Sequence, residues 1–434
     1  MKEQALLDDA AINAEPWALL SKAMLTPEGI QDPYPLLERL HEYGTHFTAP
    51  DGSVAVFGYK ALGQMTRARN FLKRNDSVPR PLFATETPEQ AAELRRVADL
   101  ETEHLVFLNQ PDHGRIRGIV NKGFKPSHIA ALRPFILELI DRLLADIDPK
   151  QPCDLMASFS SLFAPEVVGE LIGLPANQRP LIVEQTERQL RGFDPGASYE
   201  KRLDSAWARH EQCNYVREVI ADRRKCPRGD FISDLVRLSD EEGSITDAEL
   251  TSLVQILYIG GYGTTSHMIG NGVVAFATHP EQWALLCAEP ERVSDAVDEM
   301  LRYDGPISLT IVVAGEDAEI DGSPIAEGTV CFGLLGAANH DPKVFPAPSR
   351  FDITRPRTGH LAFSGGAHFC PGSPRPPQGV EPLFPQFAPP PPQIFTEFAR
   401  RFPNMRLEQE AVSLRRINAF HQRAYERLIV TLDP

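Results

Sequence analysis

Apolar residues recur at three- and four-residue spacing over much of the chain, which predicts amphipathic helices. The clearest of these segments are 128–148, 161–173, 206–224 and 291–303. Short runs that favour strands, flanked by Gly, Asp and Pro, occur at Ser53–Phe57, Leu309–Val313 and Thr329–Leu334. We find no fixed-period repeat and no flexible linker in the sequence. The pattern therefore predicts a mainly α fold with a minor β portion, in a single domain over residues 1–434.

One predicted helix is apolar nearly all round. It begins with a capping box at Thr246–Glu249, whose Thr and Glu side chains satisfy the first amides, and it stops before His279-Pro280. A helix without a polar face is expected to be buried. Its interior contains Gly260, Gly261, Gly263, Gly270 and Gly272. Each interior glycine costs about 1 kcal/mol relative to alanine. The glycines therefore either allow close helix packing or flatten the helix where something large lies against it.

Composition narrows the class of protein. The 44 Lys and Arg residues against 59 Asp and Glu give a net charge of −15, which disfavours nucleic acid or an anionic membrane as a partner. Six cysteines lie far apart without a CxxC pair, as in reduced proteins. The first residues do not resemble a signal peptide, and no apolar run reaches membrane-spanning length. We expect a cytoplasmic, monomeric protein.

The stretch that carries chemistry is Phe363–Gly372. Its glycine-rich loop allows backbone amides to point at the Cys370 sulfur, which lowers a thiol pKa and prepares a metal ligand. Phe363, Gly366, His368, Cys370 and Gly372 match the FxxGxHxCxG haem-binding motif, so the chain resembles the cytochrome P-450 family. The resemblance implies that Cys370 ligates haem iron, with the motif's other residues around the cofactor. It also implies the family's fold, with haem between the long central helix and the cysteine loop.

Other segments resemble the same family. Glu299 and Arg302 match its ExxR helix, and Arg350 matches the downstream segment that completes the ion-pair network. Without the resemblance, Glu and Arg at this spacing are usually a solvated pair. His113 and Arg117 match the PDHxRxR segment, whose cations face a haem propionate. The alternative for this second pair is a charge cluster on a surface helix.

The chain departs from the family at the central helix. The resemblance assigns catalytic positions to Gly263, Thr264 and Thr265. The family has an acid where this chain has Gly263, and that acid and the following alcohol guide protons to dioxygen. We therefore expect proton delivery to depend on Thr264, ordered water or a polar group of the substrate.

A second departure follows Cys370. Residues 371–392 include ten prolines, and we expect residues 373–393 to exclude a continuous helix, because each proline lacks an amide and clashes with the preceding turn. Helical patterning and the resemblance both return at Ile394–Arg400. Paired compensating frameshifts or a genuine insertion would each produce such a block. If the block is real, we expect a loop here and weakened haem retention.

The resemblance implies a haem-thiolate monooxygenase that hydroxylates or epoxidises a small to medium apolar molecule, as in bacterial secondary metabolism. It implies haem b, with electrons from NAD(P)H through a separate ferredoxin-type donor and its reductase. Substrate would contact segments around 70–105 and 170–200 and the first part of the central helix. Three alternatives stay open: an atypical member that forms a ring or bond, a haem protein without turnover, and a chain that does not retain haem.

Overall fold

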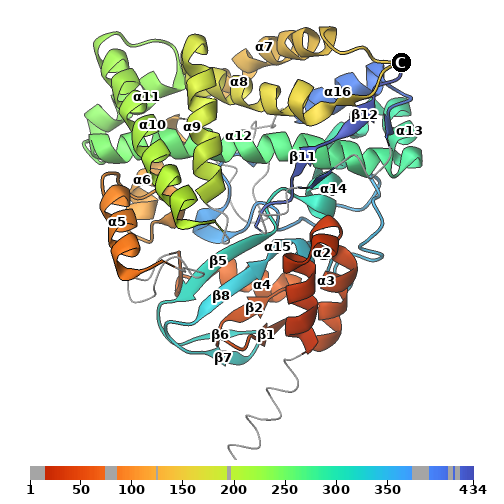
Figure 1. Ribbon diagram of the computed structural model, residues 1–434, viewed down its shortest axis with the longest axis horizontal. Coiled ribbons are helices and arrows are strands. Elements are labelled where there is room, and N and C mark those ends of the chain that lie inside the picture. The colour runs from red at the N-terminus through yellow and green to blue at the C-terminus, as the bar shows by residue number, and fades with distance from the viewer. Residues whose placement is uncertain are drawn as a thin grey trace, which may run out of the picture. The chain divides into compact units, whose positions relative to one another are not determined.

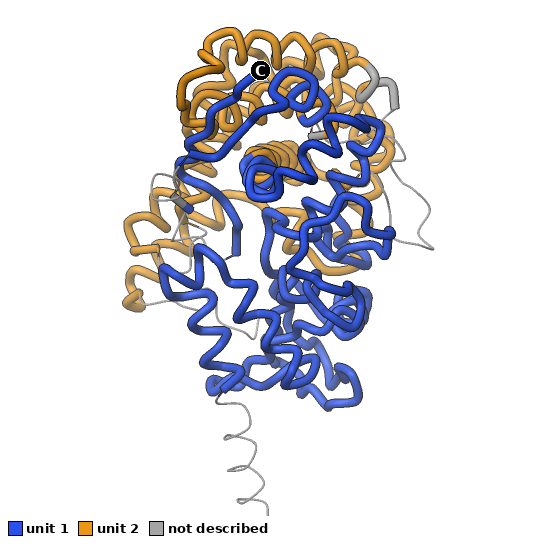
Figure 2. Tube along the Cα trace, turned by 90° about the vertical axis from the view of Figure 1, so that its right-hand side faces the viewer, with its two compact units in different colours: residues 1–78, 270–370, 395–434 blue, residues 79–269, 371–394 orange. Residues whose placement is uncertain are grey.

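The structure is a computed structural model that describes residues 15–73, 86–123, 126–192, 197–373, 391–408, 414–415 and 421–434. The chain divides into two compact units, coloured in Figure 2. Unit 1 contains residues 1–78, 270–370 and 395–434, and unit 2 contains residues 79–269 and 371–394. The helices α12 (Asp247–Ala277) and α16 (Pro391–Arg401) contribute residues to both units. The expectation of one domain over 1–434 stays a prediction.

Unit 1 is built around a sheet in the order β1-β2-β8-β5-β3. The strands of unit 1, within this sheet and outside it, are β1 (His46–Thr48), β2 (Val54–Val56), β3 (Phe71–Leu72), β5 (Leu309–Ala314), β6 (Ala318–Ile320), β7 (Ser323–Ile325), β8 (Val330–Leu334), β9 (Arg406–Leu407), β10 (Leu414–Arg415), β11 (Tyr425–Arg427) and β12 (Ile429–Thr431). Its helices are α2 (Pro27–Gln31), α3 (Tyr34–Leu40), α4 (Tyr59–Arg67), α13 (Pro280–Ala288), α14 (Val293–Asp304) and α15 (Leu335–Asn339), with short 3-10 helices η1 (His41–Tyr43), η5 (Pro290–Arg292) and η6 (Gly366–His368). Residues 15–25 are also helical.

The two faces of this sheet are buried by different helices. Because side chains alternate along a strand, Val54 and Val56 of β2 join one apolar cluster and Ala55 joins another. The first cluster includes Leu62 of α4, and the second includes Leu40 of α3. Figure 1 shows these helices beside the sheet. The sheet and α4 together position the loop that carries Cys370.

Unit 2 is mainly helical. Its helices are α5 (Pro88–Ala98), α6 (Asp112–Gly123), α7 (Pro126–Ala145), α8 (Ser161–Ile172), α9 (Arg179–Gly192), α10 (Tyr199–Lys225) and α11 (Phe231–Glu242), with shorter elements η2 (Leu105–Phe107), β4 (Cys153–Asp154), η3 (Met156–Ser160) and η4 (Ala176–Gln178). Residues of α12 that belong to this unit, among them Leu250, Leu253 and Tyr258, lie in its apolar core.

The predicted elements are confirmed, with shifted ends. The central helix runs from Asp247 to Ala277, and its capping box is present: the Glu249 amide donates to Thr246 Oγ1 at 3.2 Å, and the Thr246 amide donates to Glu249 Oε2 at 2.7 Å. Segments 128–148, 161–173, 206–224 and 291–303 fall mainly on α7, α8, α10 and α14. The three predicted strand runs match β2, β5 and β8, although β5 extends one residue beyond its predicted run to Ala314.

Most of the proline-rich block lies outside the residues that the structure describes. Residues 374–390 are not among the described residues, so the predictions for them stay predictions. The return of helix at Ile394 is confirmed as α16. The exclusion of helix up to residue 393 is wrong at its end, because α16 begins at Pro391. Proline is tolerated in the first turn, where amides have no intrahelical partner.

Candidate haem-thiolate site

The residues that the sequence singles out are divided between the two units. Phe363, Gly366, His368 and Cys370 lie in unit 1 with Glu299, Arg302 and Arg350. Gly372, His113, Arg117 and the catalytic positions Gly263, Thr264 and Thr265 lie in unit 2.

The loop before Cys370 is held by backbone bonds and by close packing on α4. The Cys370 amide donates to the Phe363 carbonyl at 3.1 Å, and Gly366 has a φ of +64°. A Cβ on Gly366 would lie 2.3 Å from the Thr66 carbonyl oxygen and 2.9 Å from Arg67 Cα, both backbone atoms of α4. Both facts require glycine at position 366. The loop thus presents Cys370, whose thiol is half-buried, in a fixed backbone turn.

Two aromatic rings flank the turn. Phe363 and Phe369 meet edge to face, with ring centroids 6.2 Å apart and an interplanar angle of 72°. His368 closes the 3-10 helix η6 and is half-buried. Gly372 follows in a turn directly after Pro371. Two aromatic rings therefore pack against each other within the stretch that ends in the half-buried Cys370.

The ion-pair network of α14 differs from the predicted network in its third member. Arg302 donates to both carboxylate oxygens of Glu299 at 2.8 Å, and both side chains are buried. The second guanidinium on Glu299 belongs to Arg355, whose Nε lies 3.2 Å from Oε1. The assignment of Arg350 to this role is wrong, because its side chain is 67% exposed. Only the Arg350 carbonyl takes part, as an acceptor from Arg302 and Arg355.

The glycines of α12 have different surroundings. A Cβ on Gly261 would lie 2.9 Å from Val168 Cγ2, and one on Gly272 would lie 2.0 Å from Met300 Cε, so close packing explains these two. A Cβ on Gly260 would meet no atom within 4 Å, and Gly263 would make only ordinary contacts. Gly260 therefore lies on an open part of the helix surface.

The open face also carries the predicted alcohol. Thr264 donates its hydroxyl hydrogen to the Gly260 carbonyl at 2.7 Å, one turn earlier. Thr264 and Thr265 are half-buried, whereas Gly263 is buried. The Thr264 hydroxyl thus keeps its oxygen lone pairs as acceptors on the half-buried surface of the helix.

The predicted propionate ligands share α6. His113 is buried, and its Nδ1 lies 3.4 Å from Gln110 Nε2. Arg117 Nε donates to Asn121 Oδ1 at 3.2 Å. The two residues are one helical turn apart, as the sequence predicts, so they occupy the same side of α6.

Sequence reasoning missed a buried polar network beside α12. The Gln255 side-chain amide donates to Gln189 Oε1 at 2.6 Å and to Gln212 Oε1 at 2.9 Å, and its own Oε1 lies 2.5 Å from His104 Nε2. Because Gln255 Oε1 is an acceptor, His104 must carry its proton on Nε2. Burial, with a smaller contribution from the Arg209 guanidinium, lowers the pKa of His104 to about 3. This network therefore links α9, α10 and α12 through uncharged side chains.

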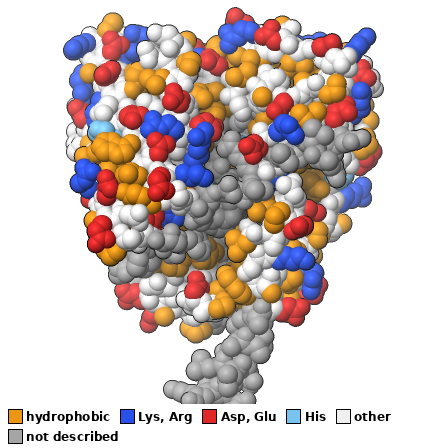
Figure 3. Space-filling model, in the orientation of Figure 1, with side chains coloured by type: hydrophobic (Ala, Val, Ile, Leu, Met, Phe, Trp, Pro, Cys, Tyr) orange, Lys and Arg blue, Asp and Glu red, His pale blue; other side chains and the backbone are white. Residues whose placement is uncertain are grey.

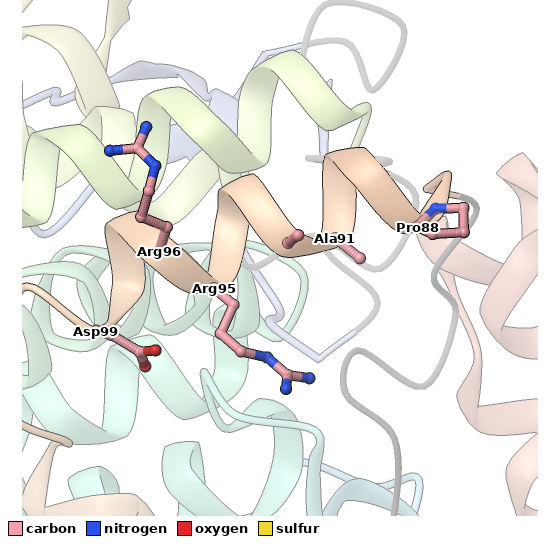
Figure 4. Close-up of a pocket in the computed structure, with 6 residues that line it drawn as sticks. Pro88, Ala91, Arg95, Arg96 and Asp99 are labelled. Atoms are coloured by element: carbon pink, nitrogen blue, oxygen red, sulfur yellow. The ribbon is translucent and has the colours of Figure 1, made fainter.

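An open pocket lies along α5, within the segment expected to contact substrate. Figure 4 shows Arg95, Arg96 and Asp99 on this helix, together with Pro88 and Ala91. These charged side chains are exposed, so the pocket is a surface feature rather than a buried site for an apolar molecule. On the face that Figure 3 shows, the described Lys and Arg side chains are interspersed with Asp and Glu.

Comparisons with known proteins identify the family. A family model described as cytochrome P450 matches residues 198–374. Cytochrome P450 monooxygenase PikC of Streptomyces venezuelae is 33% identical over 351 residues, which are 79% of this chain and 80% of that protein. The chain belongs to the cytochrome P450 family. The biotin biosynthesis cytochrome P450 of Bacillus subtilis is likewise 33% identical, over 67% of this chain and 73% of that protein.

Solved structures agree with this P450 assignment. The structure of P450BioI in complex with an acyl carrier protein carrying hexadec-9Z-enoic acid superposes with a TM-score of 0.80, at 29% identity over 94% of this chain and 99% of that chain. CxnD, a P450 for C–S bond formation in chuangxinmycin biosynthesis, gives a TM-score of 0.78 at 27% identity, over 93% of this chain and 94% of that chain. The predictions of family, fold class and P450 oxidoreductase are confirmed. Within the part of the chain that the structure describes, none of the helices has the length and hydropathy needed to cross a membrane.

Proposed function

We propose that this P450 is a haem-thiolate monooxygenase that hydroxylates or epoxidises a small to medium apolar molecule in secondary metabolism. Family membership implies a haem and an external supply of electrons. We further propose haem b, with electrons from NAD(P)H delivered in the cytoplasm by a ferredoxin-type donor and its reductase. PikC, a relative that covers four fifths of the chain, is named as a monooxygenase. Its similarity supports oxygen insertion as the reaction type.

The loop geometry at Cys370 is the observation that carries this proposal. A half-buried thiol follows a turn that requires glycine at 366, and the Cys370 amide is bonded to the Phe363 carbonyl. Burial raises the pKa of the Cys213 and Cys331 thiols to about 12, so these two cysteines are poor sources of thiolate. The geometry of the loop therefore fits a haem iron held by Cys370. When bound, thiolate-ligated haem activates dioxygen for insertion into a C–H or C=C bond.

The chain's own residues would bind and orient the haem and would supply protons. In this proposal Cys370 holds the iron, Phe363 and His368 border the ligand, and Gly366 allows the turn. His113 and Arg117 would balance the negative charge of a propionate. The ion pairs of Glu299 with Arg302 and Arg355 would stabilise the unit that bears the cysteine loop.

Proton handling is assigned to α12. Thr264 uses its hydroxyl hydrogen on the Gly260 carbonyl, so its oxygen can accept a hydrogen bond from water or substrate. Gly263 supplies no carboxylate, and Thr265 follows as a second, half-buried hydroxyl. We therefore assign water held by Thr264, rather than an acid at 263, to the last step of proton delivery.

The test replaces Cys370 with Ser and records the spectrum of the reduced protein with carbon monoxide. We expect the wild-type chain to give the far red-shifted band of a thiolate-ligated haem and Cys370→Ser to lose it. Cys287→Ser, another half-buried cysteine, is the matched control and should keep the band. A red-shifted band that survives in Cys370→Ser would contradict the proposal.

A second candidate function is oxidative formation of a ring or bond. This reaction would consume the same O2, two electrons and two protons as oxygen insertion, and the two hydrogens lost by the substrate would leave in a second water. The relative CxnD is named for C–S bond formation. Mass spectrometry of the product separates the two: oxygen insertion adds 16 Da, whereas intramolecular bond formation removes 2 Da.

A further inference from the structure

His267 lies on α12 one turn beyond Gly263 and is 3% exposed. A Cβ on Gly263 would lie 3.9 Å from His267 Cε1 and 3.5 Å from Leu190 Cδ1 of α9. Both distances are ordinary van der Waals contacts. The imidazole therefore borders the space that a side chain at position 263 would enter.

The chemistry of imidazole suits proton transfer at this place. Histidine is the side chain whose ordinary pKa lies near neutral pH, and its two nitrogens can accept a proton on one side and donate on the other. Residues three and four apart on a helix are surface neighbours, so His267 is next to both Thr264 and Gly263. Thr264 keeps its oxygen available as an acceptor, because its hydrogen is used on the Gly260 carbonyl at 2.7 Å.

We propose that His267 is the proton-relay residue of this chain, in place of a carboxylate at 263. The inference rests on the proposed monooxygenase function. Insertion of oxygen into a C–H bond consumes O2, two electrons and two protons, and yields the alcohol and one water. NAD(P)H supplies the electrons through the redox partner. The His267 imidazolium releases a proton to water beside Thr264 and regains one from solvent, so it is unchanged after each transfer.

The competing explanation is that His267 only fills the core. Loss of a proton relay would lower only the NAD(P)H-driven turnover rate, whereas loss of packing at His267 would lower the rate with either oxidant. Hydrogen peroxide brings both oxygen atoms, both electrons and both protons, so oxidation driven by peroxide takes no proton from solvent. A packing defect would impair both modes equally.

The test uses the haem-loaded full chain with 7-ethoxycoumarin as a fluorogenic apolar probe. Turnover is measured once with NAD(P)H, ferredoxin and reductase, and once with hydrogen peroxide. We expect His267→Asn to lose about a hundredfold of the NAD(P)H-driven rate, the usual size of a general acid or base contribution, and to keep the peroxide-driven rate within about twofold. Its carbon monoxide spectrum and unfolding midpoint should match those of the wild type.

Rescue makes the test specific. Adding Gly263→Asp to His267→Asn should restore most of the NAD(P)H-driven rate, because a Cβ at 263 fits and brings a new titratable group. His46→Asn, which changes a half-buried histidine of β1, is the control and should alter neither mode. Equal losses in both modes, or an unchanged NAD(P)H-driven rate, would overturn the relay. A wild-type chain inactive in both modes would overturn the proposed function and the relay with it.

Discussion

Arg355 forms an ion pair with Glu299, its Nε lying 3.2 Å from Oε1, although 56 residues separate them. Arg355 also donates to the carbonyls of Pro346, Ala347 and Arg350, so one guanidinium ties a long loop to α14. Glu299 also accepts from the Asp352 amide at 3.0 Å. The carboxylate of Glu299 is therefore the point at which α14 and the segment after Phe345 are joined.

We expect Arg355→Ala to lower the free energy of unfolding by about 3 kcal/mol, the usual cost of breaking a buried ion pair. Arg350→Ala is the matched control, because its exposed side chain can be removed while the carbonyl stays, and it should change stability by less than about 0.5 kcal/mol. Urea unfolding of both variants measures the difference. A larger loss in Arg350→Ala than in Arg355→Ala would contradict the assignment.

The ion pair of Glu299 with Arg355 could not be predicted from the sequence. The segment after Ala347 contains arginines at 350, 355 and 357, and the sequence alone does not say which one turns inward. The choice is made by a loop in which Ala347 has a φ of 48° and the Arg350 carbonyl points inward. A local pattern predicts Glu299 with Arg302 because both lie on one helix, whereas the third member depends on tertiary structure.

The same contrast holds elsewhere. The 31 residues of α12 and the strands β2, β5 and β8 follow from periodicity and capping, since these are local properties. The glutamines of the buried network look like surface residues in the sequence, and only the packing of α9, α10 and α12 buries them. His267 could have been noticed from its spacing of four from Gly263, a signal that the family resemblance did not supply.

Asp304 is a buried carboxylate that holds two guanidinium groups. Arg415 Nη2 lies 2.6 Å from Oδ2, Arg423 Nε lies 2.9 Å from Oδ1, and the Tyr34 hydroxyl donates to Oδ1 at 2.7 Å. Burial alone would raise the pKa of Asp304, but the two arginines outweigh it and hold the pKa well below its ordinary value.

We expect Asp304→Asn to destabilise the protein by about 3–5 kcal/mol, because two buried cations lose their counter-charge. Tyr34→Phe removes one hydrogen bond and no charge, so it should cost only about 1 kcal/mol. Denaturant unfolding at neutral pH compares the two. If Asp304→Asn costs no more than Tyr34→Phe, the charge balance at this site is not what stabilises it.

The buried His104 should make the stability of the protein sensitive to acid. Its pKa is lowered from 6.5 to about 3 in the folded chain, so between these values the unfolded chain binds the extra proton. Wild-type stability should therefore fall as pH falls through this window. From pH 7 to pH 5 this one group removes about 2 kcal/mol.

The variant His104→Gln keeps a donor toward Gln255 and has no titrating ring. We expect it to lose about 2 kcal/mol less than the wild type between pH 7 and pH 5, with urea unfolding at each pH as the measurement. Parallel losses in the two proteins would show that the ring of His104 is protonated without cost, and that the buried position does not lower its pKa.

The glycines of α12 predict opposite effects of the same substitution. Gly260→Ala adds a methyl group where no atom lies within 4 Å, so the gain in helix propensity should stabilise the protein by about 1 kcal/mol. Gly272→Ala would place its Cβ 2.0 Å from Met300 Cε and 2.6 Å from Phe395 Cζ, two buried side chains. Overpacking of this kind costs about 1–3 kcal/mol, which exceeds the propensity gain. Thermal unfolding of the two variants should therefore move the midpoint in opposite directions. If both midpoints rise, the contacts at Gly272 are relieved by side-chain movement, and close packing is not the reason for glycine there.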